Sequence, residues 1–147
     1  PIFDRLSDMA EDHGMHLTLE NVSYSIMPSP EIGTELHALL KRPLYHTLDL
    51  KQSIRAGYDP MAFVDAFGEQ IIAVHACDCD TSTGKPRFCL PPRGNLDFKR
   101  IVTALQRKGF CGTVLLEAYS DMFRTHEELK DAYDALDRQI NHQEETL

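Results

Sequence analysis

Four residues that could act as acids, bases or metal ligands each end a short apolar run, namely Glu20, Asp49, His75 and Glu117. The run before His75, Ile-Ile-Ala-Val, is typical of a strand buried on both faces of a parallel sheet. In such a sheet all carboxyl ends lie along one edge, so side chains that follow consecutive strands converge whatever their separation in the chain. We therefore expect these four residues to form one site at that edge.

Three carboxylates and one imidazole make a set of donors that suits Mn, Mg, Co or Zn better than a metal that prefers thiolates. A single acidic residue at a strand end is more often a helix cap or a solvated loop residue. A polar group at all four strand ends favours a shared role, because buried carboxylates are costly unless they are paired or bind a cation. The sequence therefore predicts one divalent metal ion. Cys77 and Cys79 have no second pair at zinc spacing and are expected to pack or to lie in a loop.

Helices are predicted wherever apolar residues recur at helical spacing between a capping residue and a glycine or proline. The predicted helices span residues 2–13, 30–42, 60–67, 98–108 and 126–140, with a short helical turn at 51–56. The predicted strands span residues 16–20, 44–49, 70–75 and 113–117. This alternation predicts an α/β fold with a parallel sheet and right-handed crossovers. Residues 78–95 are expected to be irregular, either as a binding loop or as a surface excursion.

The composition fits a single globular domain and excludes several functions. The chain has 147 residues, of which 42% are hydrophobic, and a formal net charge of -8. That charge argues against a nucleic-acid partner, and no apolar run approaches the roughly 20 residues of a membrane span. Without a leader segment, we expect a cytoplasmic protein whose four cysteines are reduced. His46 alternates with apolar neighbours and is expected to have a packed structural role.

The ordered segments of this chain resemble the xylose isomerase-like TIM barrels, which include sugar-phosphate isomerases and epimerases, hydroxypyruvate isomerase, inosose dehydratase and endonuclease IV. The segments that carry the resemblance are Leu19-Glu20-Asn21, Leu48-Asp49, Val74-His75 with Asp78, the stretch from Leu90 to Phe98, and Gly112 to Glu117. Each is weak alone, but they follow the order of the family and lie within residues 15–117.

The resemblance implies that residues 1–147 form one partial domain, the C-terminal half of a (β/α)8 TIM barrel. It implies a metal-dependent isomerase or epimerase of a sugar or sugar phosphate, in which Glu20 and Glu117 form the acid/base pair beside a carbonyl. The metal ligands would be Glu20, Asp49, His75 and Glu117. The expected substrate-binding residues are Gln52, Asp78, Arg87 and Arg93.

Two departures from the family pattern limit the reaction. Gln52 stands where the family often has a histidine, and it cannot shuttle protons near neutral pH. No histidine lies between Asp78 and Asn95, which disfavours an endonuclease with additional zinc ions. Dehydration of an inosose-like ketone remains an alternative, as does a non-catalytic domain that binds a sugar or completes a barrel.

Four strands would leave two sheet edges and an inner face uncovered, which is an aggregation hazard. We therefore expect the chain to be a fragment or part of a longer protein, or to be completed by an N-terminal half-barrel or by another copy in a homo-oligomer.

Overall fold

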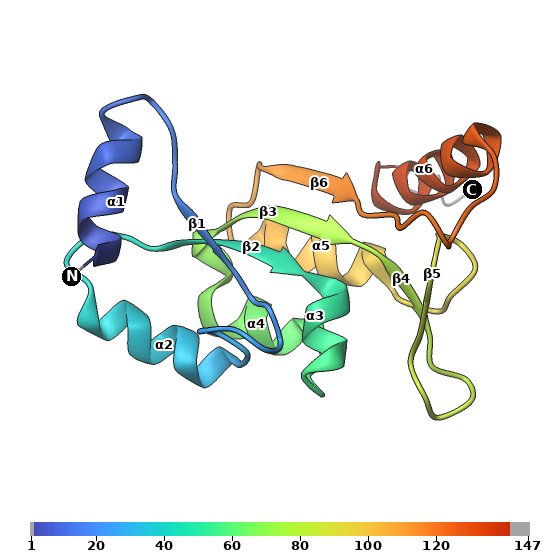
Figure 1. Ribbon diagram of the computed structural model, residues 1–147, viewed down its shortest axis with the longest axis horizontal. Coiled ribbons are helices and arrows are strands. Elements are labelled where there is room, and N and C mark those ends of the chain that lie inside the picture. Colours follow the sequence, from blue (N-terminus) through green and yellow to red (C-terminus); the bar gives the residue numbers. More distant parts are fainter. Residues whose placement is uncertain (1, 142–147) are drawn as a thin grey trace.

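The computed structural model describes residues 2–141, which form a four-stranded parallel sheet with helices between the strands (Figure 1). The sheet order is β1 (Thr18–Glu20), β2 (Tyr45–Asp49), β3 (Ile71–Ala76) and β6 (Thr113–Leu116). The helices are α1 (Ile2–Glu11), α2 (Pro30–Leu39), α3 (Leu50–Arg55), α4 (Pro60–Phe67), α5 (Phe98–Arg107) and α6 (His126–Asn141), with a 3-10 turn η1 (Gly68–Gln70). The predicted alternation of parallel strands and helices is confirmed.

The hydrophobic core lies on one face of the sheet. Leu48 of β2 and Val74 of β3 are buried there together with Phe67 of α4 and Leu105 of α5. Helices α4 and α5 lie behind the strands in Figure 1, and no helix of the described chain crosses in front of them. On that open face Leu115 of β6 is 50% exposed. The sheet therefore has one packed face and one open face.

Capping residues begin four of the helices, as predicted at Ser29, Asp59 and Asp97, whereas Asp49 was predicted only as a strand-end ligand. Ser29, Asp49, Asp59 and Asp97 each accept a hydrogen bond from a backbone N–H in the first turn of the following helix. Gly109 follows α5 with a positive φ of 92°, a backbone conformation that other residues rarely adopt. The local signals for helix starts and ends were therefore sufficient for these elements.

His46 has the packed role that was predicted for it. It is 1% exposed on the helix side of β2, and its ring lies 4.2 Å from that of Phe67 between centroids. Its Nδ1 is 3.2 Å from the carbonyl oxygen of Leu19, and its Nε2 is 2.7 Å from Nε2 of His37. Because Nδ1–H donates to the carbonyl, Nε2 of His46 is the acceptor and His37 is the donor.

The segment 78–95 differs from the prediction because it contains a second, antiparallel sheet. Strands β4 (Asp78–Asp80) and β5 (Arg87–Cys89) pair as a hairpin beyond the end of β3. The buried carboxylate of Asp78 accepts hydrogen bonds from the N–H groups of Cys79, Gly94 and Leu96. These bonds hold the two ends of the segment together, which gives the loop an order that its composition does not reveal.

Helix α1 also differs, since its predicted apolar face is not buried. Ile2 is 69% exposed and Met9 is 60% exposed. The helix is instead attached by polar contacts, because Asp4 accepts hydrogen bonds from the backbone N–H groups of Lys41 and Arg42. Leu39, one of the apolar residues at helical spacing in the second helix, is likewise 71% exposed.

The outer edges of β1 and β6 pair with no other strand among residues 2–141. No helix within that range has the length and apolar character needed to cross a bilayer.

Candidate functional site

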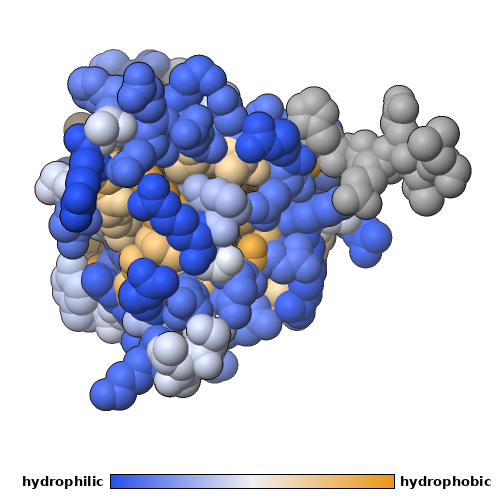
Figure 2. Space-filling view, turned by 90° about the vertical axis from the view of Figure 1, so that its right-hand side faces the viewer, coloured by the Kyte–Doolittle hydropathy of each residue, from blue (hydrophilic) through white to orange (hydrophobic). Residues whose placement is uncertain are grey.

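The structure brings together three of the four strand-end residues. Ligand atoms of Glu20, Asp49 and His75 all lie within 4.8 Å of one another. Oε1 of Glu20 is 3.8 Å from Nδ1 of His75. Figure 2 shows the side of the molecule toward which the strands of the parallel sheet point, where polar surface surrounds an apolar centre.

The strand register explains why these side chains share a face. Asp49 lies opposite His75, whereas Glu20 lies opposite Thr47, two residues before Asp49. On the other side His75 lies opposite Leu115, two residues before Glu117. Side chains alternate between faces with a period of two, so offsets of two residues keep all four groups on the open face. Their positions step diagonally across the sheet.

Asp49 is held rigidly and keeps one oxygen free of hydrogen bonds. It is 1% exposed, and its Oδ1 accepts a hydrogen bond of 2.9 Å from the backbone N–H of Gln52. Asn21 fixes its backbone, accepting from the N–H at 2.7 Å and donating to the carbonyl at 3.0 Å. Its Oδ2 is buried and has no hydrogen-bond partner among the described residues. Burial raises the pKa of Asp49 to about 7, and the nearby charge of Glu117 also raises it.

Glu117 is not part of the group of three, and another pair of side chains holds it. Its Oε1 accepts hydrogen bonds from Nζ of Lys51 at 3.0 Å and from the hydroxyl of Tyr119 at 2.6 Å. Its Oε2 is buried without a hydrogen-bond partner in the described part of the chain. Burial alone would raise the pKa of Glu117, but the hydrogen bonds from Tyr119 and Lys51 bring it below its usual value.

Lys51 is the site residue that the sequence did not reveal. It is 1% exposed although lysine is normally a surface residue, and it also contacts the hydroxyl of Tyr119. Its ion pair with Glu117 joins residues that are 66 positions apart in the chain. The one local signal was its place two residues after Asp49, at the start of α3.

The four residues predicted to bind substrate lie in different environments. Oε1 of Gln52 accepts a hydrogen bond of 2.9 Å from the hydroxyl of Ser23, and Asp78 holds the hairpin segment as described above. Arg87 is exposed and pairs with Asp80 at 3.1 Å. Arg93 donates to the carbonyl of Met122. These contacts account for Gln52 and Asp78 as structural groups, and a role in substrate binding stays a prediction for all four.

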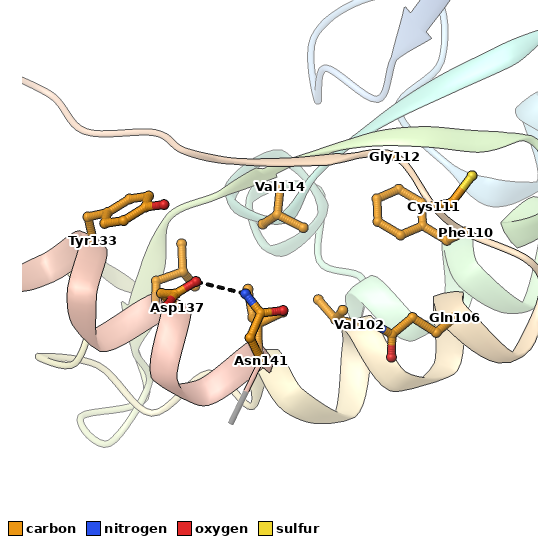
Figure 3. Close-up of a pocket in the computed structure, with 11 residues that line it drawn as sticks. Val102, Gln106, Phe110, Cys111, Gly112, Val114, Tyr133, Asp137 and Asn141 are labelled. Atoms are coloured by element: carbon orange, nitrogen blue, oxygen red, sulfur yellow. Dashed lines mark hydrogen bonds between the residues drawn. The ribbon is translucent and has the colours of Figure 1, made fainter. Parts of the chain in front are cut away.

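A cavity of about 270 Å³ lies elsewhere, between α5, α6 and β6 (Figure 3). Val102 of α5 and Val114 of β6 line it, and a hydrogen bond of 2.7 Å joins Asn141 to Asp137 at its α6 side. Val114 and Leu115 point to opposite faces of the sheet. The cavity therefore lies on the helix side of β6, on the face opposite to Glu20, Asp49 and Glu117.

The comparison with protein families fits this arrangement. The model of the family described as xylose isomerase-like TIM barrel matches residues 2–139. The chain belongs to the xylose isomerase-like TIM barrel family. Its parallel strands and alternating helices are those of this family, and no curated protein matches the sequence significantly.

Solved structures share the fold at low sequence identity. The 3-keto-D-glucoside 4-epimerase YcjR from E. coli superposes with a TM-score of 0.73 at 14% identity, covering 91% of this chain and 50% of the epimerase. The probable 3-DHS dehydratase AsbF from Bacillus anthracis gives 0.70 at 15% identity, with 97% and 55% covered. D-allulose 3-epimerase from Methylomonas sp. gives 0.65 at 22% identity, with 90% and 45% covered. This xylose isomerase-like chain thus spans about half the length of these proteins.

Proposed function

We propose that this chain carries the divalent-metal site of a carbohydrate isomerase or epimerase that moves a proton next to a carbonyl group. The observation that carries the proposal is a buried carboxylate oxygen without a hydrogen-bond donor, Oδ2 of Asp49, in the group that Asp49 forms with Glu20 and His75. Oε2 of Glu117, whose charge acts on Asp49, is a second such oxygen. Buried carboxylate oxygens without donors are unfavourable unless they share a proton or bind a cation. The fold similarity to two sugar epimerases supports the same class of substrate.

The donors fit a hard divalent cation. Glu20, Asp49 and His75 would hold it through two carboxylate oxygens and one imidazole nitrogen, and Oε2 of Glu117 is available as a fourth donor. Mn, Mg, Co and Zn all accept such a set. When bound, the cation would hold substrate oxygens and stabilise negative charge that develops on the carbonyl oxygen.

The sheet order supports giving the proton transfers to the two glutamates. Glu20 ends one edge strand and Glu117 follows the other, with Asp49 and His75 between them. A small sugar placed over the middle strands would therefore have one carboxylate on each side. One glutamate would take the proton beside the carbonyl and the other would return a proton to the opposite face, which inverts the carbon centre. The lowered pKa of Glu117 keeps it ionised at neutral pH, as a base requires.

The rest of the substrate pocket would come from additional barrel strands. The free edges of β1 and β6 could each accept another parallel strand, supplied by the same protein or by a second copy. This chain covers only about half of the length of the two epimerases, which supports this part of the proposal.

Solvent-deuterium exchange into candidate ketoses, followed by NMR in the presence of Mn²⁺, tests the proposal. We expect exchange at the carbon beside the carbonyl, loss of exchange in Glu117→Gln, and no loss in the matched control Glu127→Gln, whose side chain is exposed on α6. A dehydrated product would indicate a lyase on the same site. Metal binding without exchange into any sugar would instead favour a non-catalytic domain and contradict the proposal.

A further inference from the structure

We propose that Lys51 and Tyr119 act as a clamp on Glu117, holding its Oε1 so that only Oε2 faces the divalent cation. Lys51 is thereby a positioning residue for the site, and this inference rests on the proposed function. The clamp consists of these two side chains and no others.

The hydrogen bonds to Glu117 define the clamp. Both donors point at the same oxygen, since Nζ of Lys51 is 3.0 Å from Oε1 and the hydroxyl of Tyr119 donates to it at 2.6 Å. The other oxygen is buried and has no hydrogen-bond partner among residues 2–141. Two hydrogen bonds to one oxygen stop the carboxylate from rotating, and a charge-assisted bond is the stronger kind. Glu117 is therefore oriented before any ligand arrives.

Asp49 has the same arrangement, with one oxygen in a hydrogen bond and the other without one. Its Oδ1 accepts the N–H of Gln52, whereas its Oδ2 is buried without a hydrogen-bond partner in the described chain. Both carboxylates thus have one oxygen fixed by the protein and one left over. This repeated pattern indicates preorganisation of two donors rather than a simple ion pair.

The burial of Lys51 supports the clamp. At 1% exposure its ammonium group has lost its hydration, which is unfavourable unless its partners compensate. The compensating partners are Glu117 and Tyr119, which both contact Nζ. An apolar side chain of similar length would fill the same space at lower cost. The ammonium group therefore acts on the site and is not needed to fill the core.

The positive charge of Lys51 makes the direction of the change in metal affinity informative when this residue is replaced. Charge alone makes Lys51 oppose a divalent cation, so its removal would tighten metal binding. A clamp predicts the reverse, because a loosened Glu117 is a poorer ligand. The effect of the clamp must also disappear when residue 117 no longer supplies a carboxylate.

A double-mutant cycle measures this difference. The readout is the dissociation constant for Mn²⁺, followed by electron paramagnetic resonance of free Mn²⁺ in the intact protein. We expect Lys51→Met to weaken Mn²⁺ binding about tenfold, which corresponds to about 1.4 kcal/mol and is typical of one hydrogen bond to a charged group. In the Glu117→Gln background the same change should have no weakening effect. Lys130→Met, at an exposed lysine paired with Asp134, is the matched control and should bind as the wild type does.

Tyr119→Phe is the second variant, because Tyr119 is 43% exposed and its replacement spares the core even if Lys51→Met does not fold. We expect it to weaken Mn²⁺ binding about threefold, again only when Glu117 is present. Lys51→Arg should restore part of the affinity lost in Lys51→Met.

Two results overturn the clamp while leaving the proposed function intact. One is Mn²⁺ binding that is unchanged or tighter in Lys51→Met and Tyr119→Phe. The other is an equal weakening with and without Glu117. Absence of Mn²⁺ binding by the wild-type protein would overturn the proposed function and the clamp together.

Discussion

Replacing Asp49 by asparagine should make the metal-free protein more stable at pH 8, although it removes a proposed metal ligand. Burial raises the pKa of Asp49 from 3.8 to about 7. Between these two values the folded protein keeps a proton that the unfolded chain releases, so stability falls as the pH rises. Asparagine stays neutral and can still accept the hydrogen bond from the backbone N–H of Gln52 that now reaches Oδ1.

The magnitude follows from the shift. One pKa unit corresponds to about 1.4 kcal/mol, and integration from pH 5 to pH 8 gives a change of about 3 kcal/mol in favour of Asp49→Asn. The contribution of His46 to the free energy of unfolding rises with pH instead, because burial lowers its pKa to about 4. In the wild type the two pH dependences nearly cancel below about pH 6.5, and only that of Asp49 remains above it. The difference between the variant and the wild type removes the His46 contribution, since both proteins contain it.

Urea unfolding at pH 5, 6, 7 and 8 in the presence of EDTA measures this difference. Asp59→Asn is the matched control, because Asp59 caps α4 in the same way but has an exposed side chain. Its effect on the free energy of unfolding should not vary with pH over this range. A gain in Asp49→Asn that does not grow with pH, or lower stability of that variant than of the wild type at pH 8, would contradict a raised pKa of Asp49 in the folded protein.

Three further predictions concern the fold around the site. His46 is neutral in the folded protein, so its contribution to the free energy of unfolding is complete above pH 6.5 and is lost as the pH falls toward 4. In urea unfolding over that range, the free energy of unfolding of His46→Gln should fall by about 3 kcal/mol less than that of the wild type. Parallel pH curves for the two proteins would contradict this. Asp78→Ala should speed hydrogen exchange of the Gly94 amide at least about tenfold by mass spectrometry, and unchanged exchange would argue against its structural role. Gly112→Ala should lower the free energy of unfolding by about 3 kcal/mol in thermal denaturation, because its Cβ would lie 1.9 Å from the carbonyl oxygen of Ile72. A variant as stable as the wild type would show that β6 can shift.

The fold was predictable because local signals agreed with the tertiary arrangement. Apolar β-branched runs such as residues 71–74 became strands, although Ile72 and Ala73 are only partly buried and burial on both faces was predicted. Asp59 followed by Pro60 began a helix as expected. The carboxyl-end rule then placed Glu20, Asp49 and His75 together without any knowledge of distances. Helix α1 shows where this reasoning stops. An apolar face on a helix does not state what covers it, and the described chain leaves Ile2 exposed.

The remaining features depend on contacts between distant residues. The hairpin in 78–95 is tied by Asp78 to amides 16 and 18 positions away, and its strand sequences, Asp-Cys-Asp and Arg-Phe-Cys, carry little strand signal. The burial of Lys51 could not be predicted, because its partner Glu117 follows a different strand and lies 66 positions away in the chain. The hydrogen bonds that Glu117 accepts from Lys51 and Tyr119 were hidden for the same reason. A sequence pattern identifies which groups approach one edge, but hydrogen-bond competition decides how each is oriented.

The central claim is that these strand-end groups bind one divalent metal ion. The most direct measurement is an anomalous difference map from crystals of the protein grown with Mn²⁺. We predict a single strong peak within about 2.0 to 2.6 Å of ligand atoms from Glu20, Asp49 and His75, the range of hard-cation coordination. A map with no peak among these residues, in crystals grown with saturating Mn²⁺, would contradict the account.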